Sequence, residues 1–110
     1  MNTAELIAEI RATYDRHGWR LRRVLLRPET SERLAAALDD LLDVAVRASD
    51  FDALWFARAS NGNREAWELR LISENPFALF EAFEANETEE EREEMLQEME
   101  NRMREHVTGN

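Results

Sequence analysis

The 110-residue chain has no cysteine, no lysine and only three glycines. Without cysteine it can form no disulfide, no thiolate nucleophile and no cysteine-ligated zinc site. Three glycines are too few for a glycine-rich phosphate-binding loop. All fourteen basic residues are arginine, and together with abundant alanine this is typical of a GC-rich bacterial genome. These absences exclude several common kinds of catalytic and cofactor site.

Long hydrophobic runs are also missing. The longest wholly apolar run covers residues 53–57, whereas a membrane-spanning helix needs about twenty residues. The first twenty residues carry charges such as Glu5, Glu9 and Arg11 where a signal peptide requires an apolar stretch. We therefore expect a cytoplasmic protein that has no membrane partner.

Positive charge is scarce, because 24 acidic residues face 14 arginines and leave a net charge of −10. This balance disfavours direct binding to nucleic acid or to anionic lipid, since both require positive charge. Residues 1–48 carry eight arginines and eight acidic residues, whereas residues 49–110 carry six arginines and sixteen acidic residues. The acidic surplus therefore belongs to the C-terminal part of the chain.

The apolar spacing in the first half predicts two helices around a strand. A helix over 3–17 is indicated by a periodic apolar stripe that ends at Gly18. Residues 19–27 read as a strand, and the change of apolar parity within it predicts a bulge or burial on both faces near Arg22 and Arg23. A second amphipathic helix is expected to begin at Thr30 or Ser31 and to end near Ser49.

A β-hairpin is predicted around Asn61-Gly62, because this dipeptide suits a two-residue type I′ turn. With that turn, residues whose numbers sum to 123 lie opposite each other, so Phe56 faces Trp67. The other face carries Trp55 opposite Glu68, and Ala53 opposite Arg70. A three-residue loop would change the sum to 124 and mix the two sets, so the pattern favours the two-residue turn.

The segment 77–84 fits either a third hairpin strand or a helix, and we favour the strand, with Phe80 beside Leu69 and Glu81 beside Glu68. Thr88 and Glu91 form a capping box for a final helix over 88–107. The sequence thus predicts one α+β domain over 1–110, with a frayed tail at 108–110. Its sheet is small and mainly antiparallel, with three to four strands, in the order α-β-α-β-β-(β)-α.

No residue pattern predicts a catalytic, cofactor or metal site. His17 and His106 both lie in last helical turns, where a cation is favoured by the helix dipole. Clustered carboxylates, such as Asp39 with Asp43, lack the loop spacing that wraps a hard cation. We therefore expect a protein that is not an enzyme and that needs no cofactor.

Two surfaces are candidates for protein partners or self-association. The first is the sheet face with Trp55, Glu68 and Arg70, which no predicted element covers. The second is the last helix, whose methionines can adapt to a partner surface. Its candidate residues are Met95, Met99, Met103, Glu89, Glu90, Glu93 and Glu94.

One cluster of positive charge remains, made by Arg20, Arg22, Arg23 and Arg27, which could hold a phosphate or carboxylate. We favour the simpler interpretation that these arginines pair with acidic residues of the same chain. For function we expect a protein-interaction or adaptor module, with homodimerisation as one form of that role. The alternative is an acidic inhibitor that imitates nucleic acid toward a basic partner protein.

Overall fold

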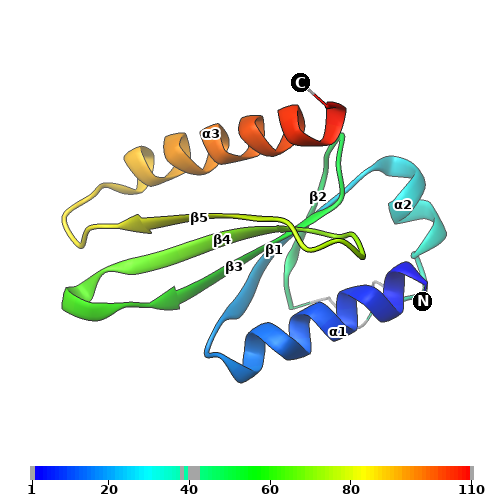
Figure 1. Cartoon of the computed structure of the whole chain (residues 1–110), viewed down its shortest axis with the longest axis horizontal. Coiled ribbons are helices and arrows are strands. Elements are labelled where there is room, and N and C mark those ends of the chain that lie inside the picture. The colour runs from blue at the N-terminus through cyan, green and yellow to red at the C-terminus, as the bar shows by residue number, and fades with distance from the viewer. Residues whose placement is uncertain (1, 38, 40–42, 110) are drawn as a thin grey trace.

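The computed structural model describes residues 2–37, 39 and 43–109. Within this part, three α-helices and five β-strands form an α+β fold (Figure 1). The strand order is β2-β1-β3-β4-β5, with β1 and β2 parallel and the other neighbours antiparallel, so the sheet is mixed and larger than predicted. The bounds are α1 Thr3–Arg16, β1 Arg20–Leu26, α2 Pro28–Arg33, β2 Ala45–Ala48, β3 Ala53–Ala59, η2 Asn61–Asn63, β4 Glu65–Leu71, β5 Ala78–Phe83 and α3 Glu89–Thr108.

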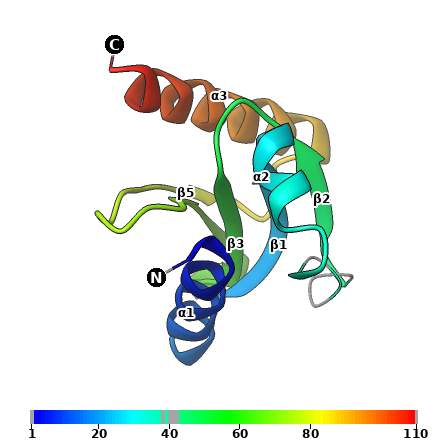
Figure 2. The same cartoon turned by 90° about the vertical axis from the view of Figure 1, so that its right-hand side faces the viewer.

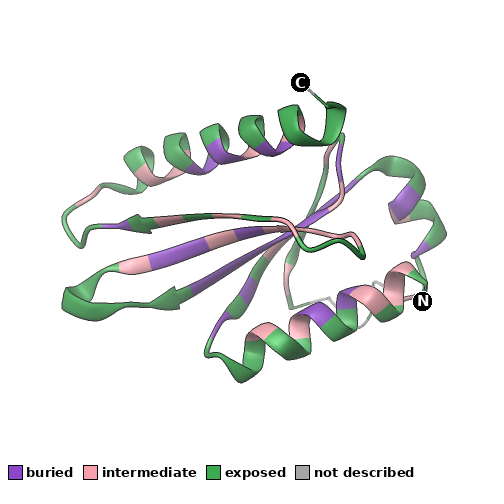
Figure 3. Ribbon diagram, viewed as in Figure 1, coloured by how far each residue is buried: buried purple, intermediate pink, exposed green. Residues whose placement is uncertain are grey.

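Helices α1 and α3 lie on opposite faces of the sheet, as Figures 1 and 2 show from two directions. Both helices carry buried residues, which are coloured purple in Figure 3: Ile7 and Ile10 on α1, and Leu96, Met99 and Met103 on α3. The core is therefore divided by the sheet into two clusters. The α1 side contains Ile7, Ile10, Val24, Leu54 and Phe56, and the α3 side contains Trp55, Trp67, Leu69, Leu96, Met99 and Met103.

Strand β1 contains the bulge that its sequence predicts. The pairing of β1 with β3 shifts between Leu21 and Arg23, which leaves Arg22 as the extra residue. Because of this shift, Leu21 and Val24 both reach the α1-side core although they differ in parity. The change of parity along the sequence was thus a correct indicator of the local geometry.

The predicted register of the β3–β4 hairpin is wrong by one residue. Ala53 lies opposite Leu71 and Trp55 opposite Leu69, so paired residues sum to 124. The turn uses the three residues Asn61–Asn63, in which Gly62 and Asn63 both have positive φ. The two-residue turn was chosen because it gathers the large apolar residues of both strands, such as Phe56 and Trp67, on one face of the sheet. Both faces are covered, so the premise of that choice does not hold.

Trp55 accordingly does not lie on an uncovered sheet face. Its side chain is fully buried under α3, and its Nε1–H donates to Glu100 Oε2 at 2.9 Å. Its ring meets Trp67 edge to face at 5.9 Å between centroids. Helix α3 supplies the cover that the sequence interpretation left unassigned.

The long helix predicted up to Ser49 is also wrong. Helix α2 begins at Pro28, ends at Arg33, and is followed by strand β2 at Ala45–Ala48. Leucines 38, 41 and 42 of the predicted helix lie outside the described residues. Strand β2 forms a parallel ladder on the otherwise free edge of β1, and this pairing overrides the local helix propensity of the segment.

The start of α2 is fixed by Asp52 and not by the expected Thr30 or Ser31 cap. Pro28 occupies the first turn after Arg27. The Arg27 backbone N–H donates to Asp52 Oδ1 at 2.8 Å, and its guanidinium reaches Oδ2 at 3.2 Å. The hydroxyl of the fully buried Thr30 donates to the same Oδ2 at 2.8 Å. One carboxylate therefore joins the end of β1, α2 and the loop before β3.

The preference for a strand over 77–84 is confirmed by β5, but its register is again shifted by one. Phe80 lies opposite Glu68, and Glu81 lies opposite Trp67. The expected contact between Glu68 and Glu81 is therefore absent, since the two side chains leave opposite faces of the sheet. Phe80 was expected beside Leu69, but it lies on the opposite, α1-side face and is 55% exposed.

The two terminal helices agree with the sequence interpretation to within one or two residues. The Asn2 side chain caps α1 by accepting from the Glu5 N–H at 2.9 Å. Thr88 Oγ1 accepts from the Glu91 N–H and donates to its carboxylate, both at 3.1 Å. Thr88 therefore caps the last helix as predicted, but the Glu91 carboxylate accepts from the Thr88 hydroxyl and not from its backbone N–H, so only one half of the capping box is formed.

Helix α3 covers the core on its side of the sheet, and Met99 lies in that core. Met99→Ala is therefore expected to lower the free energy of unfolding by about 2–5 kcal/mol. Met99 is fully buried, whereas Met95, one turn earlier, is 39% exposed. Met95→Ala is the matched control and should cost less than about 1 kcal/mol. Urea unfolding followed by circular dichroism measures both, and equal losses would contradict the packing of α3 described here.

Candidate functional site

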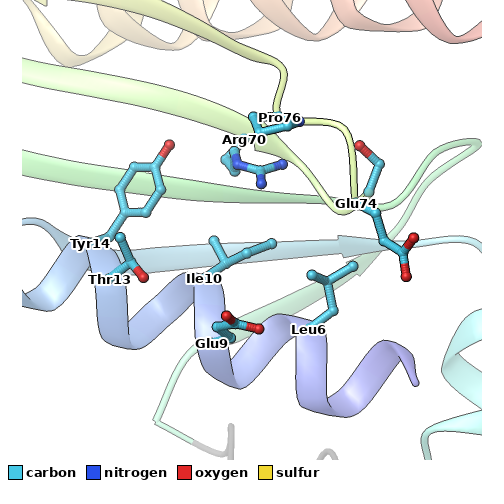
Figure 4. A pocket seen from close by; sticks show the side chains of 9 residues that line it. Leu6, Glu9, Ile10, Thr13, Tyr14, Arg70, Glu74 and Pro76 are labelled. Atoms are coloured by element: carbon cyan, nitrogen blue, oxygen red, sulfur yellow. The ribbon is translucent and has the colours of Figure 1, made fainter. Parts of the chain in front are cut away.

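A groove of about 500 Å³ lies between α1 and the connection from β4 to β5 (Figure 4). Helix α1 forms one wall, and the β4–β5 connection forms the other. Arg70 of β4 lies between them. The lining residues are Leu6, Glu9, Ile10, Thr13, Tyr14, Arg70, Ser73, Glu74 and Pro76.

The groove exists because α1 covers only part of its face of the sheet. Ile7 and Ile10 anchor the helix in a cluster with Val24 of β1 and Phe56 of β3. Strands β4 and β5 lie farther along the same face. Their side chains on that face are therefore left beside the helix and not under it.

Tyr14 joins the helix to β4 through its hydroxyl, which donates a hydrogen bond to Glu68 Oε2. Its ring stacks on Phe56 with centroids 4.0 Å apart. Burial raises the pKa of the Tyr14 hydroxyl well above its usual value of 10.0, and the hydrogen bond to Glu68 and its negative charge raise it further. The hydroxyl therefore stays protonated and serves as a donor.

Arg70 is the cation of the groove. It is half-buried, and its Nη1 donates to the carbonyl oxygen of Leu71. No carboxylate among the described residues lies within 4 Å of its guanidinium. Glu9 and Glu74 line the same groove from exposed positions. The groove thus combines an apolar wall, one cation and two carboxylates.

A row of aromatic rings continues from the groove to the edge of the sheet. Tyr14 meets Trp19 edge to face at 6.1 Å between centroids, and Trp19 meets Phe80 at 6.3 Å. A smaller hollow of about 230 Å³ lies along this row, lined by Tyr14, His17 and Trp19 among others. The exposed Phe80 is the outer end of the row.

The predicted interaction residues fall into two groups. Trp55, Met99 and Met103 are fully buried and belong to the core. Glu68 and Arg70 lie on the opposite face from Trp55, where Arg70 lines the groove and Glu68 accepts from the Tyr14 hydroxyl, although both were selected for a face they do not occupy. Among the predicted methionines, Met95 is the exposed one.

The predicted arginine patch is not a single surface. Arg23 pairs with Glu93 at 2.5 Å and Arg27 with Asp52 at 3.2 Å, as the simpler interpretation expected. The Arg22 guanidinium lies 5.2 Å from the centre of the Trp67 ring, and that of Arg23 lies 5.6 Å from it. Arg20 begins β1 and is exposed, about 20 Å along the strand from Arg27.

The acidic residues at the start of α3 are only partly available to a partner. Glu93 is held by Arg23, and this hydrogen bond lowers the pKa of Glu93 below its usual value of 4.5. Glu89, Glu90 and Glu94 are exposed. The acidic surface is therefore shared between a structural ion pair and solvated side chains.

The two histidines have local contacts. The His17 ring approaches the Thr13 carbonyl oxygen at 2.9 Å, and the His106 ring stacks on Phe77 with centroids 3.5 Å apart. In the described part of the chain, no three histidine, aspartate or glutamate side chains are grouped as metal ligands. Among the described helices, none is long and apolar enough to cross a membrane.

Comparison with protein-family models, curated proteins and solved structures gave no significant match to this chain. The site must therefore be interpreted from its own residues. Sequence reasoning did not select Leu6, Glu9, Glu74 or Pro76 as site residues, since they come together only through the packing of α1 beside the β4–β5 connection. The one signal of this site in the sequence was Arg70, a charged residue on a strand face that also carries core residues.

The chain has a single tyrosine, so the pKa of Tyr14 can be measured from the ultraviolet absorbance of its phenolate. We expect the folded protein to titrate well above pH 10.0 and the urea-unfolded chain to titrate at about that value. Glu68→Gln should lower the pKa of Tyr14 but leave it raised, because burial is the largest cause. A folded-state pKa equal to that of the unfolded chain would show that Tyr14 is not buried in this way.

The Arg23–Glu93 pair predicts a pH-dependent contribution to stability. Because the pKa of Glu93 is lower in the folded state, the contribution is present above about pH 4.5 and is lost as the pH falls through the folded-state value. Glu93→Gln should cost at most about 1 kcal/mol at about pH 7, since the Glu93 side chain is 44% exposed and solvent screens the pair.

The free energies of unfolding of the wild type and Glu93→Gln should therefore differ at about pH 7, and the difference should shrink as the pH falls below about 4.5. Glu94→Gln is the control, because Glu94 lies on the same turn and has no ion pair with a described residue. A difference between wild type and Glu93→Gln that persists in acid would rule out the ion pair as its cause.

Proposed function

We propose that this protein is a non-enzymatic protein-interaction module that self-associates through the free edge of β5. The observation that supports this most directly is the 55% exposure of Phe80 on an edge strand with the sequence Ala-Leu-Phe-Glu-Ala-Phe. An apolar edge strand without lysine or proline is a template for pairing with another strand. Strand β5 is the last strand of the sheet, so no described strand pairs with its outer edge.

The pairing of β5 with β4 determines which backbone groups are free. The Leu71 N–H donates to the Phe77 carbonyl at 3.0 Å, so Phe77 belongs to a hydrogen-bonded pair. Hydrogen-bonded and non-bonded pairs alternate in an antiparallel ladder. Ala78, Phe80 and Ala82 therefore direct their N–H and C=O groups toward the free edge.

Two-fold symmetry then favours one register. In an antiparallel β5–β5 ladder centred on Phe80, each Phe80 lies opposite its copy and each Ala78 lies opposite Ala82. This register pairs the largest number of outward backbone groups, and it places the two exposed phenyl rings in contact. A register centred on Glu81 would instead place two carboxylates opposite each other, which is unfavourable.

The absence of native cysteine makes the register testable by disulfide formation. Phe80→Cys should give an oxidised dimer, because opposed residues of a hydrogen-bonded pair have Cα atoms about 5.5 Å apart. The double variant Ala78→Cys/Ala82→Cys should also cross-link, with Phe80 retained. Single Ala78→Cys and Ala82→Cys variants are controls, because each cysteine would lie about 13 Å from its copy.

Light scattering over a range of concentrations tests the dimer without cross-links. We expect Phe80→Glu to be monomeric, whereas Val46→Glu on the opposite edge strand, where Val46 is 41% exposed, should behave as the wild type. Because each copy carries −10, dimerisation should strengthen as salt is added. Two results together would contradict the proposal: a wild-type protein that is monomeric at every concentration, and a Phe80→Cys variant that forms no oxidised dimer.

A further inference from the structure

The groove beside α1 presents a guanidinium that has no acidic partner within the chain. Arg70 is half-buried and is contacted by the Leu71 carbonyl, and the described residues offer it no carboxylate within 4 Å. Arginine remains charged at any physiological pH and binds carboxylates through paired N–H donors. The floor of the groove is therefore suited to receive a carboxylate.

The rim of the groove carries the opposite charge. Glu9 on α1 and Glu74 on the β4–β5 connection are both exposed, and neither forms an ion pair with a described residue (Figure 4). A ligand with only a carboxylate would be repelled by these two side chains. A ligand that also carries an ammonium group would match the cation on the floor and the carboxylates on the rim.

The remaining walls are mainly apolar, with the hydroxyl residues Thr13 and Ser73 among them. Leu6, Ile10 and Pro76 line the groove together with Tyr14, whose hydroxyl is already bonded to Glu68. A volume of about 500 Å³ lies within the range of small-molecule sites. The size and the lining are suited to a compact molecule with an apolar side chain.

We propose that this groove binds an apolar α-amino acid, either free or as a short peptide with free termini. Arg70 receives the carboxylate, Glu9 and Glu74 hold the ammonium group, and the side chain packs on Leu6 and Ile10. This inference is independent of dimerisation through β5, since every residue it uses comes from one chain.

Titration calorimetry on the full chain tests the charge pattern. L-Phenylalanine should bind, whereas N-acetyl-L-phenylalanine lacks the ammonium and L-phenylalaninamide lacks the carboxylate, so each should bind at least tenfold more weakly. The dipeptide Phe-Phe tests the second source of the same chemistry, because its termini are farther apart. The proposal is overturned if N-acetyl-L-phenylalanine binds with the same affinity as L-phenylalanine. It is also overturned if neither L-phenylalanine nor the dipeptide gives a heat of binding at millimolar concentration.

Substitutions test the roles that the proposal gives to Arg70, Glu9 and Glu74 in binding the ligand. Arg70→Gln should lower the affinity for L-phenylalanine at least tenfold, and Arg70→Lys, which keeps the charge but loses the paired donors, should lower it less. The double variant Glu9→Gln/Glu74→Gln should bind L-phenylalanine and N-acetyl-L-phenylalanine with equal affinity. Arg64→Gln, on an exposed arginine beside β4, is the control and should bind as the wild type.

Thermal unfolding separates loss of binding from loss of fold. A folded Arg70→Gln variant that binds L-phenylalanine as tightly as the wild type overturns the assignment of Arg70. If Arg70→Gln does not fold, Arg70→Lys and the double glutamate variant carry the test with the same readout.

Discussion

Strand β3 carries large apolar side chains on both faces, and this constraint determines the arrangement of the whole chain. Trp55 and Leu69 lie on one side of the sheet, and Leu54 and Phe56 lie on the other. Burial of both faces requires a layer on each side, because every apolar face must pack against another element. Helices α1 and α3 supply those layers, and the fold has three layers as a result.

The same constraint explains where the sequence was informative. The parity change around Arg22 and Arg23 and the helix cap at Thr88 are local signals, and both were interpreted correctly. The hairpin register was wrong because it was selected to gather the apolar residues of both strands on one face of the sheet, whereas the apolar residues of β3 belong to two cores. Residues 30–49 were interpreted as one helix because periodicity does not show that the edge of β1 is free to pair with Ala45–Ala48.

Helix α1 covers only part of its face of the sheet. The two candidate surfaces, the groove and the free edge of β5, lie on the part that it leaves uncovered. A helix of 14 residues anchored over β1 and β3 does not extend over β5. Arg70 and Phe80 are consequently beside the helix, one in the groove and the other at the open edge. Glu68 and Arg70 were selected from the sequence for a different face. The grouping of Arg70 with Leu6, Glu9 and Pro76 depends on tertiary packing that no local pattern contains.

The acidic surplus limits which part of the surface can meet a second copy. Residues 49–110 hold sixteen acidic residues, and much of this charge lies along α3, where Glu89, Glu90 and Glu94 are exposed. Two α3 surfaces brought together would repel strongly at low ionic strength. Strand β5 carries one carboxylate, Glu81, and that side chain leaves the face opposite to Phe80. Within the acidic half of the chain, β5 is therefore the strand that combines a free edge with an apolar side chain and little opposing charge.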